Sequence, residues 1–326
     1  MESVSRFRPL LPGGHLQTLG GVLARSFLKW PFPSEDIVVE AGHDVRLLLR
    51  ASWQEKGADR PALLLVHGLE GSDEAHYLVS TGVAAFRSGW HVVRMNMRGC
   101  GDSLSLCPQL YNAGLTGDLR AATEWLASRV ARFAIVGFSL GAGLTLLTLA
   151  RERRRLPGAL KAASAVCPPL DMTRCADALE ERANFIYQAR FTGSLCASYK
   201  RRQRRAPERY ELGRERGITT LRQFDDVITA FYGGYRNAEA YYQSVSTGPV
   251  LAELERPTLV LSSTNDPFIP LESVLHWQLS GAVTLEITKG AGHVGFVGPS
   301  CAPRFFWAAD RVLRFFEQID SLSIGI

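Results

Sequence analysis

A five-residue motif, Gly137-Phe138-Ser139-Leu140-Gly141, most constrains what this chain can fold into. The apolar, β-branched residues 132–136 before it predict a buried strand, and residues 142–150 after it predict a helix packed on most sides. Glycines at both ends allow a sharp turn from strand to helix, with Ser139 at its tip. The pattern therefore predicts a strained serine that presents its hydroxyl for nucleophilic attack. The alternative is a glycine-rich turn in which the serine only caps the helix.

Strand-like and helical segments alternate along most of the chain. The strand-like segments are 37–40, 45–51, 62–66, 91–96, 132–136, 162–167, 258–262 and 283–288, and the helical ones are 75–87, 117–130, 142–150, 271–277 and 303–319. This alternation predicts an α/β fold with a mostly parallel central sheet flanked by helices. The first two strands are joined by a short turn, so we expect them to form an antiparallel edge of that sheet.

The regular pattern is interrupted in the second half of the chain. Residues 169–255 are rich in arginine, tyrosine and phenylalanine and show helical but no strand-like periodicity. Because this stretch lies between two predicted sheet strands, we interpret it as a helical cap inserted over the mouth of the sheet. The predicted organisation is an N-terminal arm (1–33), a first core segment (34–168), the cap (169–255) and a second core segment (256–326).

Composition and charge favour a cytoplasmic enzyme without a nucleic-acid partner. The 326 residues carry a net charge of 37 − 32 = +5, and no apolar stretch is long enough to span a membrane. The six cysteines show no metal-ligand spacing, which favours reduced thiols. The basic run at 200–205 is interpreted as a solvated helix face rather than a head-group or nucleic-acid site. Membrane contact through an apolar stripe within residues 19–30 stays open but is not expected.

A serine hydroxyl needs a base within hydrogen-bond reach and an acid that orients the base. His293 lies in a glycine-rich loop directly after the last predicted strand, and Asp266 lies in the loop after the preceding strand. Both loops should meet Ser139 at the same edge of the sheet, so we predict His293 as the base and Asp266 as the acid. The weaker candidates are His276 for the base and Asp171, Asp225 and Asp226 for the acid.

The developing oxyanion needs two backbone N–H donors. We expect them to be the N–H of Leu140, which follows the nucleophile, and the N–H of Leu69, in the loop after the strand at 62–66. His67, Arg98 and His15 are predicted to hold loops and the N-terminal arm in place by hydrogen bonds. No metal or organic cofactor is needed for this chemistry.

Several motifs together resemble the fourth AB hydrolase subfamily, the YheT-like esterases. They are Gly14-His15-Leu16-Gln17-Thr18-Leu19, His67-Gly68-Leu69-Glu70-Gly71-Ser72, Asn96-Met97-Arg98-Gly99-Cys100, the motif around Ser139, Asn265-Asp266-Pro267 and Gly292-His293-Val294-Gly295-Phe296. The resemblance covers nearly the whole chain. It implies an α/β-hydrolase fold with a helical cap, and carboxylic ester hydrolysis by Ser139, Asp266 and His293. It also makes lipid esters a candidate substrate class.

The expected activity is hydrolysis of small-molecule or lipid esters, with a preference for apolar acyl chains because the cap is rich in aromatic residues. Two alternatives stay open. An acyltransferase would use the same triad with an alcohol or a thiol in place of water, and a binding protein would keep the fold without turnover. Asn265 and Ala291 stand where relatives often carry aspartate and glycine, and neither change removes a catalytic group.

Overall fold

The fold is that of a computed structural model, which describes residues 7–23, 28–55, 57, 59–319 and 322. An eight-stranded sheet runs through the molecule in the order β1-β2-β4-β3-β5-β6-β7-β8. The strands are β1 (Glu35–Gly42), β2 (Val45–Ser52), β3 (Ala62–Val66), β4 (His91–Asn96), β5 (Phe133–Phe138), β6 (Leu160–Val166), β7 (Thr258–Ser263) and β8 (Val283–Thr288). β1 and β2 are antiparallel to their neighbours, and the strands from β4 to β8 are parallel. The predicted α/β fold is confirmed.

The flanking helices cover both faces of the sheet. The chain moves from β3 through α2 (His76–Arg87) to β4, and then back across β3 through α3 (Thr116–Ala127) to β5. Connections between parallel strands through a helix are right-handed. The connection through α2 and the one through α3 run in opposite directions across the sheet, so the two helices lie on opposite faces. α10 (Trp307–Glu317) packs on α2, and α4 (Leu140–Arg151) packs on α3. Every residue of β3 and β5 is buried between these two layers, which explains their continuous apolar sequences.

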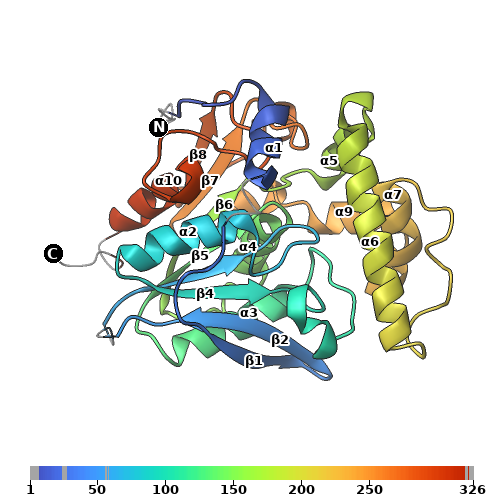
Figure 1. Ribbon diagram of the computed structural model, residues 1–326, viewed down its shortest axis with the longest axis horizontal. Coiled ribbons are helices and arrows are strands. Elements are labelled where there is room, and N and C mark those ends of the chain that lie inside the picture. Colours follow the sequence, from blue (N-terminus) through green and yellow to red (C-terminus); the bar gives the residue numbers. More distant parts are fainter. Residues whose placement is uncertain (1–6, 24–27, 56, 58, 320–321, 323–326) are drawn as a thin grey trace.

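The chain between β6 and β7 is helical, and its helices stand together beside the sheet (Figure 1). They are α5 (Met172–Glu180), η3 (Arg182–Asn184), α6 (Phe185–Arg205), α7 (Leu221–Phe224), the π-helix η4 (Asp225–Ala230), α8 (Phe231–Gly233), α9 (Ala238–Val245) and η5 (Pro249–Glu253). The long helix α6 is the main element of this group. It lies along the carboxyl ends of the parallel strands. Tyr187 near its start contacts Phe268 in the loop after β7, and Arg202 near its end contacts Gly99 in the loop after β4.

The remaining short elements are α1 (Gly14–Leu23), η2 (Gly101–Ser105), η6 (Leu271–Ser273) and η7 (Pro303–Phe305). α1 is the short helix that we expected in the N-terminal arm. The apolar stripe considered within residues 19–30 includes Phe27, which lies outside the described residues. Within the described part of the chain, no helix combines the length and the apolar character needed to cross a bilayer.

Two predicted helices are shorter in the structure. The segment 271–277 forms only the short turn η6, because side chains occupy two of its carbonyl oxygens. The His276 Nδ1 lies 2.8 Å from the carbonyl oxygen of Glu272. The Trp277 indole N–H donates to that of Ser273 at 2.7 Å. These are the carbonyls that a continuing helix would use. The segment 303–319 is divided into η7 and α10, because Phe305 has a φ of 55° and cannot continue a helix.

The basic run at 200–205 is not a uniformly solvated helix face. Lys200, Arg201, Arg204 and Arg205 are exposed, as predicted. Arg202 is buried, however, and its guanidinium donates to the carbonyl oxygen of Gly99 at 2.8 Å and to the Ser198 hydroxyl. This buried arginine ties α6 to the loop after β4. The prediction was wrong for this residue because one face of α6 packs on the sheet domain.

Candidate active site

Ser139 occupies the turn between β5 and α4. Its backbone has φ 53° and ψ −121°, a conformation that non-glycine residues rarely adopt. Its N–H donates to the carbonyl oxygen of Val166 at 2.9 Å, which holds the turn against β6. A Cβ atom added at Gly141 would lie 2.3 Å from the carbonyl oxygen of His67, and one added at Gly137 would lie 2.3 Å from that of Gly141. The two glycines therefore let the turn close tightly, as the motif predicted.

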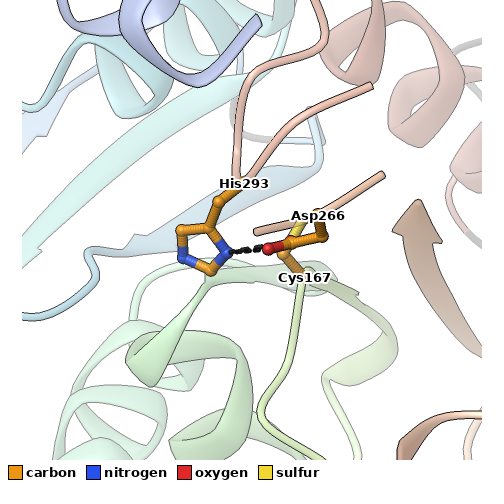
Figure 2. Close-up of side chains that lie close together, drawn as sticks. All are labelled: Cys167, Asp266 and His293. Atoms are coloured by element: carbon orange, nitrogen blue, oxygen red, sulfur yellow. Dashed lines mark hydrogen bonds and ion pairs between the residues drawn. The ribbon is translucent and has the colours of Figure 1, made fainter. Parts of the chain in front are cut away.

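His293 and Asp266 meet Ser139 from the loops after β8 and β7. The imidazole Nε2 of His293 lies 2.8 Å from Ser139 Oγ. Its Nδ1 lies 2.9 Å from Asp266 Oδ2 (Figure 2). A carboxylate only accepts hydrogen bonds, so Nδ1 carries the proton and Nε2 is free to accept the one on Ser139. The structure thus brings together the three side chains singled out in the sequence.

The carboxylate of Asp266 is held on both of its oxygens. Oδ1 accepts from the backbone N–H groups of Phe268 and Ile269 at 2.8 and 3.1 Å, while Oδ2 faces His293. The Asp266 side chain is 1% exposed and the His293 side chain 10% exposed. Burial strengthens this charge-assisted contact, because little water competes for the carboxylate.

Cys167 lies beside Asp266 and His293, and sequence reasoning did not single it out (Figure 2). It follows β6 directly, has a φ of 51°, and its Sγ accepts from the N–H of Val294 at 3.4 Å. Burial, and then the nearby Asp266 carboxylate, raise the pKa of this thiol well above its usual value. A protonated thiol is a poor nucleophile. The position of Cys167 directly after a strand of the parallel sheet is the sequence signal that could have placed it at this site.

The loop after β3 approaches Ser139 from the opposite side. A Cβ atom added at Gly68 would lie 3.0 Å from that of Ser139. The N–H groups on either side of Leu69 are tied to tyrosine hydroxyls: that of Gly68 donates to Tyr77 at 2.9 Å and that of Glu70 to Tyr111 at 2.8 Å. These contacts fix the peptide that carries the predicted Leu69 donor. The other predicted donor, the N–H of Leu140, belongs to the first residue of α4 and so has no acceptor within that helix.

A cavity of about 180 Å³ opens onto Ser139 and His293. Its walls are largely apolar and include Leu69 and Phe268 from sheet loops and Ile186, Tyr187 and Phe191 from α6. Thr18 and Leu19 of α1, His76 and Tyr77 of α2, and the charged residues Glu70 and Arg190 also line it. An apolar chamber next to a serine and an imidazole is suited to the acyl part of an ester.

The weaker candidates have other roles in the structure. Asp171 caps α5 through the N–H of Arg174, and Asp226 accepts from the N–H of Ala238. Asp225 is buried and bonded to Thr229 and Tyr242, and burial raises its pKa to about 6. His276 is exposed. These environments place them in local structure rather than beside Ser139.

The residues expected to hold loops make such contacts. His67 contacts the carbonyl oxygen of Gly68 through Nδ1 at 2.7 Å and accepts from the N–H of Met97 at 3.1 Å. Arg98 is bonded to the Asp118 carboxylate, with an Nε–Oδ2 distance of 2.7 Å. His15 stacks on Tyr187, with ring centroids 5.7 Å apart and a hydrogen bond of 3.3 Å.

Comparison with known proteins shows the family of this chain. The family model of the alpha/beta hydrolase fold matches residues 61–298. The chain belongs to the α/β-hydrolase family. Among the relatives of this hydrolase is the esterase-type protein YheT of Escherichia coli (strain K12), 31% identical over 306 residues, which cover 91% of this chain and 88% of YheT. This similarity places the hydrolase in the YheT-like group.

Two other relatives carry names that describe lipid hydrolysis. Phospholipase ABHD3 of Mus musculus is 29% identical, covering 82% of this hydrolase and 66% of the mouse protein. The monoacylglycerol lipase of Saccharomyces cerevisiae is 27% identical, with 79% and 59% covered. Among solved structures, the esterase of Pyrobaculum calidifontis aligns with a TM-score of 0.57 at 19% identity, covering 95% of this hydrolase and 92% of that chain. At this identity the structural likeness supports the fold alone.

Proposed function

We propose that this hydrolase cleaves carboxylic esters through a covalent acyl-enzyme, with Ser139 as nucleophile, His293 as general base and Asp266 as orienting acid. The observation that carries the proposal is the unbroken chain of contacts from Asp266 Oδ2 through the imidazole to Ser139 Oγ, with distances of 2.9 and 2.8 Å. These lengths allow proton transfer without rearrangement of the loops. Phospholipase, lipase and esterase-type relatives support the same reaction class.

In the first step His293 Nε2 takes the hydroxyl proton as Ser139 Oγ attacks the ester carbonyl carbon. The tetrahedral oxyanion that forms is stabilised by the N–H groups of Leu69 and Leu140. Its collapse breaks the ester C–O bond, and the imidazolium gives its proton to the leaving alcohol. Water then attacks the acyl carbon as His293 takes one of its protons. The second tetrahedral intermediate breaks the bond between the acyl carbon and Ser139 Oγ, the imidazolium returns its proton to Oγ, and the carboxylic acid leaves. Asp266 stabilises the imidazolium in both steps and stays ionised.

The domain organisation in this proposal follows the sequence. Residues 34–168 and 256–326 form the hydrolase core, residues 1–33 form an N-terminal arm, and residues 169–255 form a cap. The cap contributes Tyr187 and Phe191 to the cavity wall, next to Phe268 of the core. Substrates are therefore esters with an apolar acyl chain, and lipid esters are included in this class.

Purified protein assayed with p-nitrophenyl esters tests the proposal. Replacement Ser139→Ala should lower kcat on the order of 10³-fold or more. Ser105→Ala, at an exposed serine outside the cavity lining, should leave kcat unchanged. Ester turnover by Ser139→Ala at the wild-type rate would exclude this site. Adding an alcohol or a thiol acceptor and measuring the products distinguishes hydrolysis from acyl transfer.

A further inference from the structure

The loop that carries His293 is held from two sides. On the sheet side, the hydroxyl of Ser263 donates to the carbonyl oxygen of Ala291 at 2.7 Å, and the Asn265 side-chain oxygen accepts from the N–H of Gly290 at 2.9 Å. These bonds fix the loop before His293. From His293 onward, the loop is bonded to Cys167 and to Trp307 through Val294 and Phe296. It is also bonded to α1, which comes from the opposite end of the chain.

Thr18 of α1 contacts the backbone of the proposed base directly. Its Oγ1 accepts a hydrogen bond from the N–H of His293 at 2.8 Å and donates one to the carbonyl oxygen of Gly14 at 2.7 Å. The Thr18 residue is 6% exposed. Both the donor and the acceptor function of the hydroxyl are therefore used, and its orientation is fixed by the turn of α1 that contains it.

Gln17 of α1 binds the far end of the same loop. Its amide oxygen accepts from the N–H of Val297 at 2.7 Å, and its amide nitrogen donates to the carbonyl oxygen of Val297 at 3.1 Å and to that of Leu11 at 2.9 Å. The residue is fully buried. Both N–H donors of this buried amide and its oxygen are hydrogen-bonded to the backbone, which fixes its orientation.

The helix and the loop approach each other too closely for side chains to lie between them. A Cβ atom added at Gly292 would lie 2.4 Å from Thr18 Oγ1, and one added at Gly295 would lie 2.3 Å from the carbonyl oxygen of Gln17. The N–H of Gly292 also donates to the carbonyl oxygen of Gly295 at 2.8 Å, closing the loop on itself. The loop is thus shaped to fit α1.

We infer that Thr18 and Gln17 are positioning residues for the base, and that α1 is a working part of the active site. The inference rests on the proposed function. Without the Thr18 hydroxyl, the N–H of His293 would lose its acceptor, which favours a displaced loop that regains one. The match to the family model begins at residue 61, so α1 lies outside the part of the chain that it covers. A shift of about 1 Å at a catalytic group lowers turnover by roughly 10²-fold.

The test compares three variants at two positions. Thr18→Val removes the hydroxyl at nearly constant volume, Thr18→Ser keeps it, and Leu16→Ala changes an exposed residue of the same helix. We expect Thr18→Val to lower kcat roughly 10- to 100-fold with KM changed less than threefold. Thr18→Ser, the conservative variant that keeps the hydroxyl, should rescue kcat relative to Thr18→Val. Leu16→Ala, outside the cavity lining, should leave kcat and KM within threefold of the wild type. If Thr18→Val does not fold, Thr18→Ala takes its place, since it also lacks the hydroxyl and needs less space.

A spectroscopic readout separates this inference from the esterase proposal. The proton that His293 Nδ1 shares with Asp266 should give a low-field NMR resonance in the wild type and in Thr18→Ser, and this resonance should be lost or broadened in Thr18→Val. This result does not depend on which substrate the enzyme accepts. The inference is overturned if Thr18→Val keeps both the resonance and kcat, if its loss is in KM alone, or if Thr18→Ser loses as much kcat as Thr18→Val.

Discussion

The imidazole Nε2 of His293 lies 2.8 Å from the hydroxyl oxygen of Ser139, although the two residues are 154 positions apart in the chain. The parallel sheet creates this contact. β5 ends one residue before Ser139 and β8 ends shortly before His293, and parallel strands present their carboxyl ends at one edge. β7, which lies next to β8, brings Asp266 to the same edge.

The orienting role of Asp266 can be tested by removing its charge. In Asp266→Asn the side-chain oxygen can still accept from Phe268 and Ile269, which turns the amide NH₂ toward His293 Nδ1. Nδ1 then has to act as an acceptor, and Nε2 carries the proton and no longer accepts one from Ser139. We expect kcat to fall about 10²- to 10⁴-fold while the thermal melting temperature changes little. Asp102→Asn, at an exposed carboxylate, is the control. If kcat of Asp266→Asn stayed within threefold of the wild type, Asp266 would not orient His293.

The tight turn at Ser139 predicts a strong effect of adding one methyl group. Gly141→Ala would place Cβ 2.3 Å from the carbonyl oxygen of His67 and 2.6 Å from that of Val66, both of which are backbone atoms. We expect the free energy of unfolding to fall by more than about 2 kcal/mol in urea titrations. Gly193→Ala, in the interior of α6 with no atom within 4 Å, should raise it by about 1 kcal/mol instead. Equal effects of the two substitutions would show that the turn is not closely packed.

Buried His67 predicts a loss of stability in mild acid. Burial lowers its pKa from 6.5 to about 4, against smaller opposing effects of the Gly68 carbonyl and Asp73. Below pH 6.5 the unfolded chain binds a proton at this position that the folded protein does not, so the free energy of unfolding falls as the pH falls toward 4. The contribution between pH 7 and 4.5 is about 2–3 kcal/mol. His67→Asn should show a correspondingly smaller loss over this range in urea titrations, and parallel pH profiles would refute the assignment.

The cavity next to Ser139 predicts a dependence of rate on acyl length. Its apolar wall of Leu69, Tyr187, Phe191 and Phe268 should bury several methylene groups, each contributing about 0.8 kcal/mol, or roughly a factor of four. The ratio kcat/KM should therefore be at least about tenfold higher for octanoate than for acetate esters of p-nitrophenol. Phe191→Ala should reduce this preference for octanoate over acetate esters. Equal rates on both esters would remove the argument for an apolar acyl substrate.

Much of the fold could be predicted because local sequence and sheet geometry agree. Strands such as β3 and β5 are buried on both faces and therefore read as continuous apolar runs, and each is followed by a turn rich in glycine. Residues placed after such strands must lie at one edge, which is why Asp266 and His293 were selected from the sequence. The selection used topology and needed no side-chain geometry.

Contacts that do not follow from the order of the sheet strands could not be predicted in this way. The hydrogen bond from His293 to Thr18 joins residues 275 positions apart, and no periodicity in α1 indicates its partner. Arg202 belongs to a run of basic residues, and the sequence of that run does not indicate that this arginine is the one that contacts Gly99. The turn at 271–277 replaced a predicted helix because two side chains took the carbonyl oxygens of the backbone. The first two cases depend on tertiary packing and the third on side-chain contacts with the backbone, and hydrophobic periodicity indicates neither.

The central claim is that His293 activates Ser139, and labelling with a fluorophosphonate tests it most directly. The probe forms a covalent bond with an activated serine oxygen, and peptide mass spectrometry locates the adduct. The account predicts a single adduct on Ser139, its absence in Ser139→Ala, and labelling at least about 10²-fold slower in His293→Ala. An unlabelled Ser139 in protein that hydrolyses esters, or labelling of His293→Ala at the wild-type rate, would contradict it.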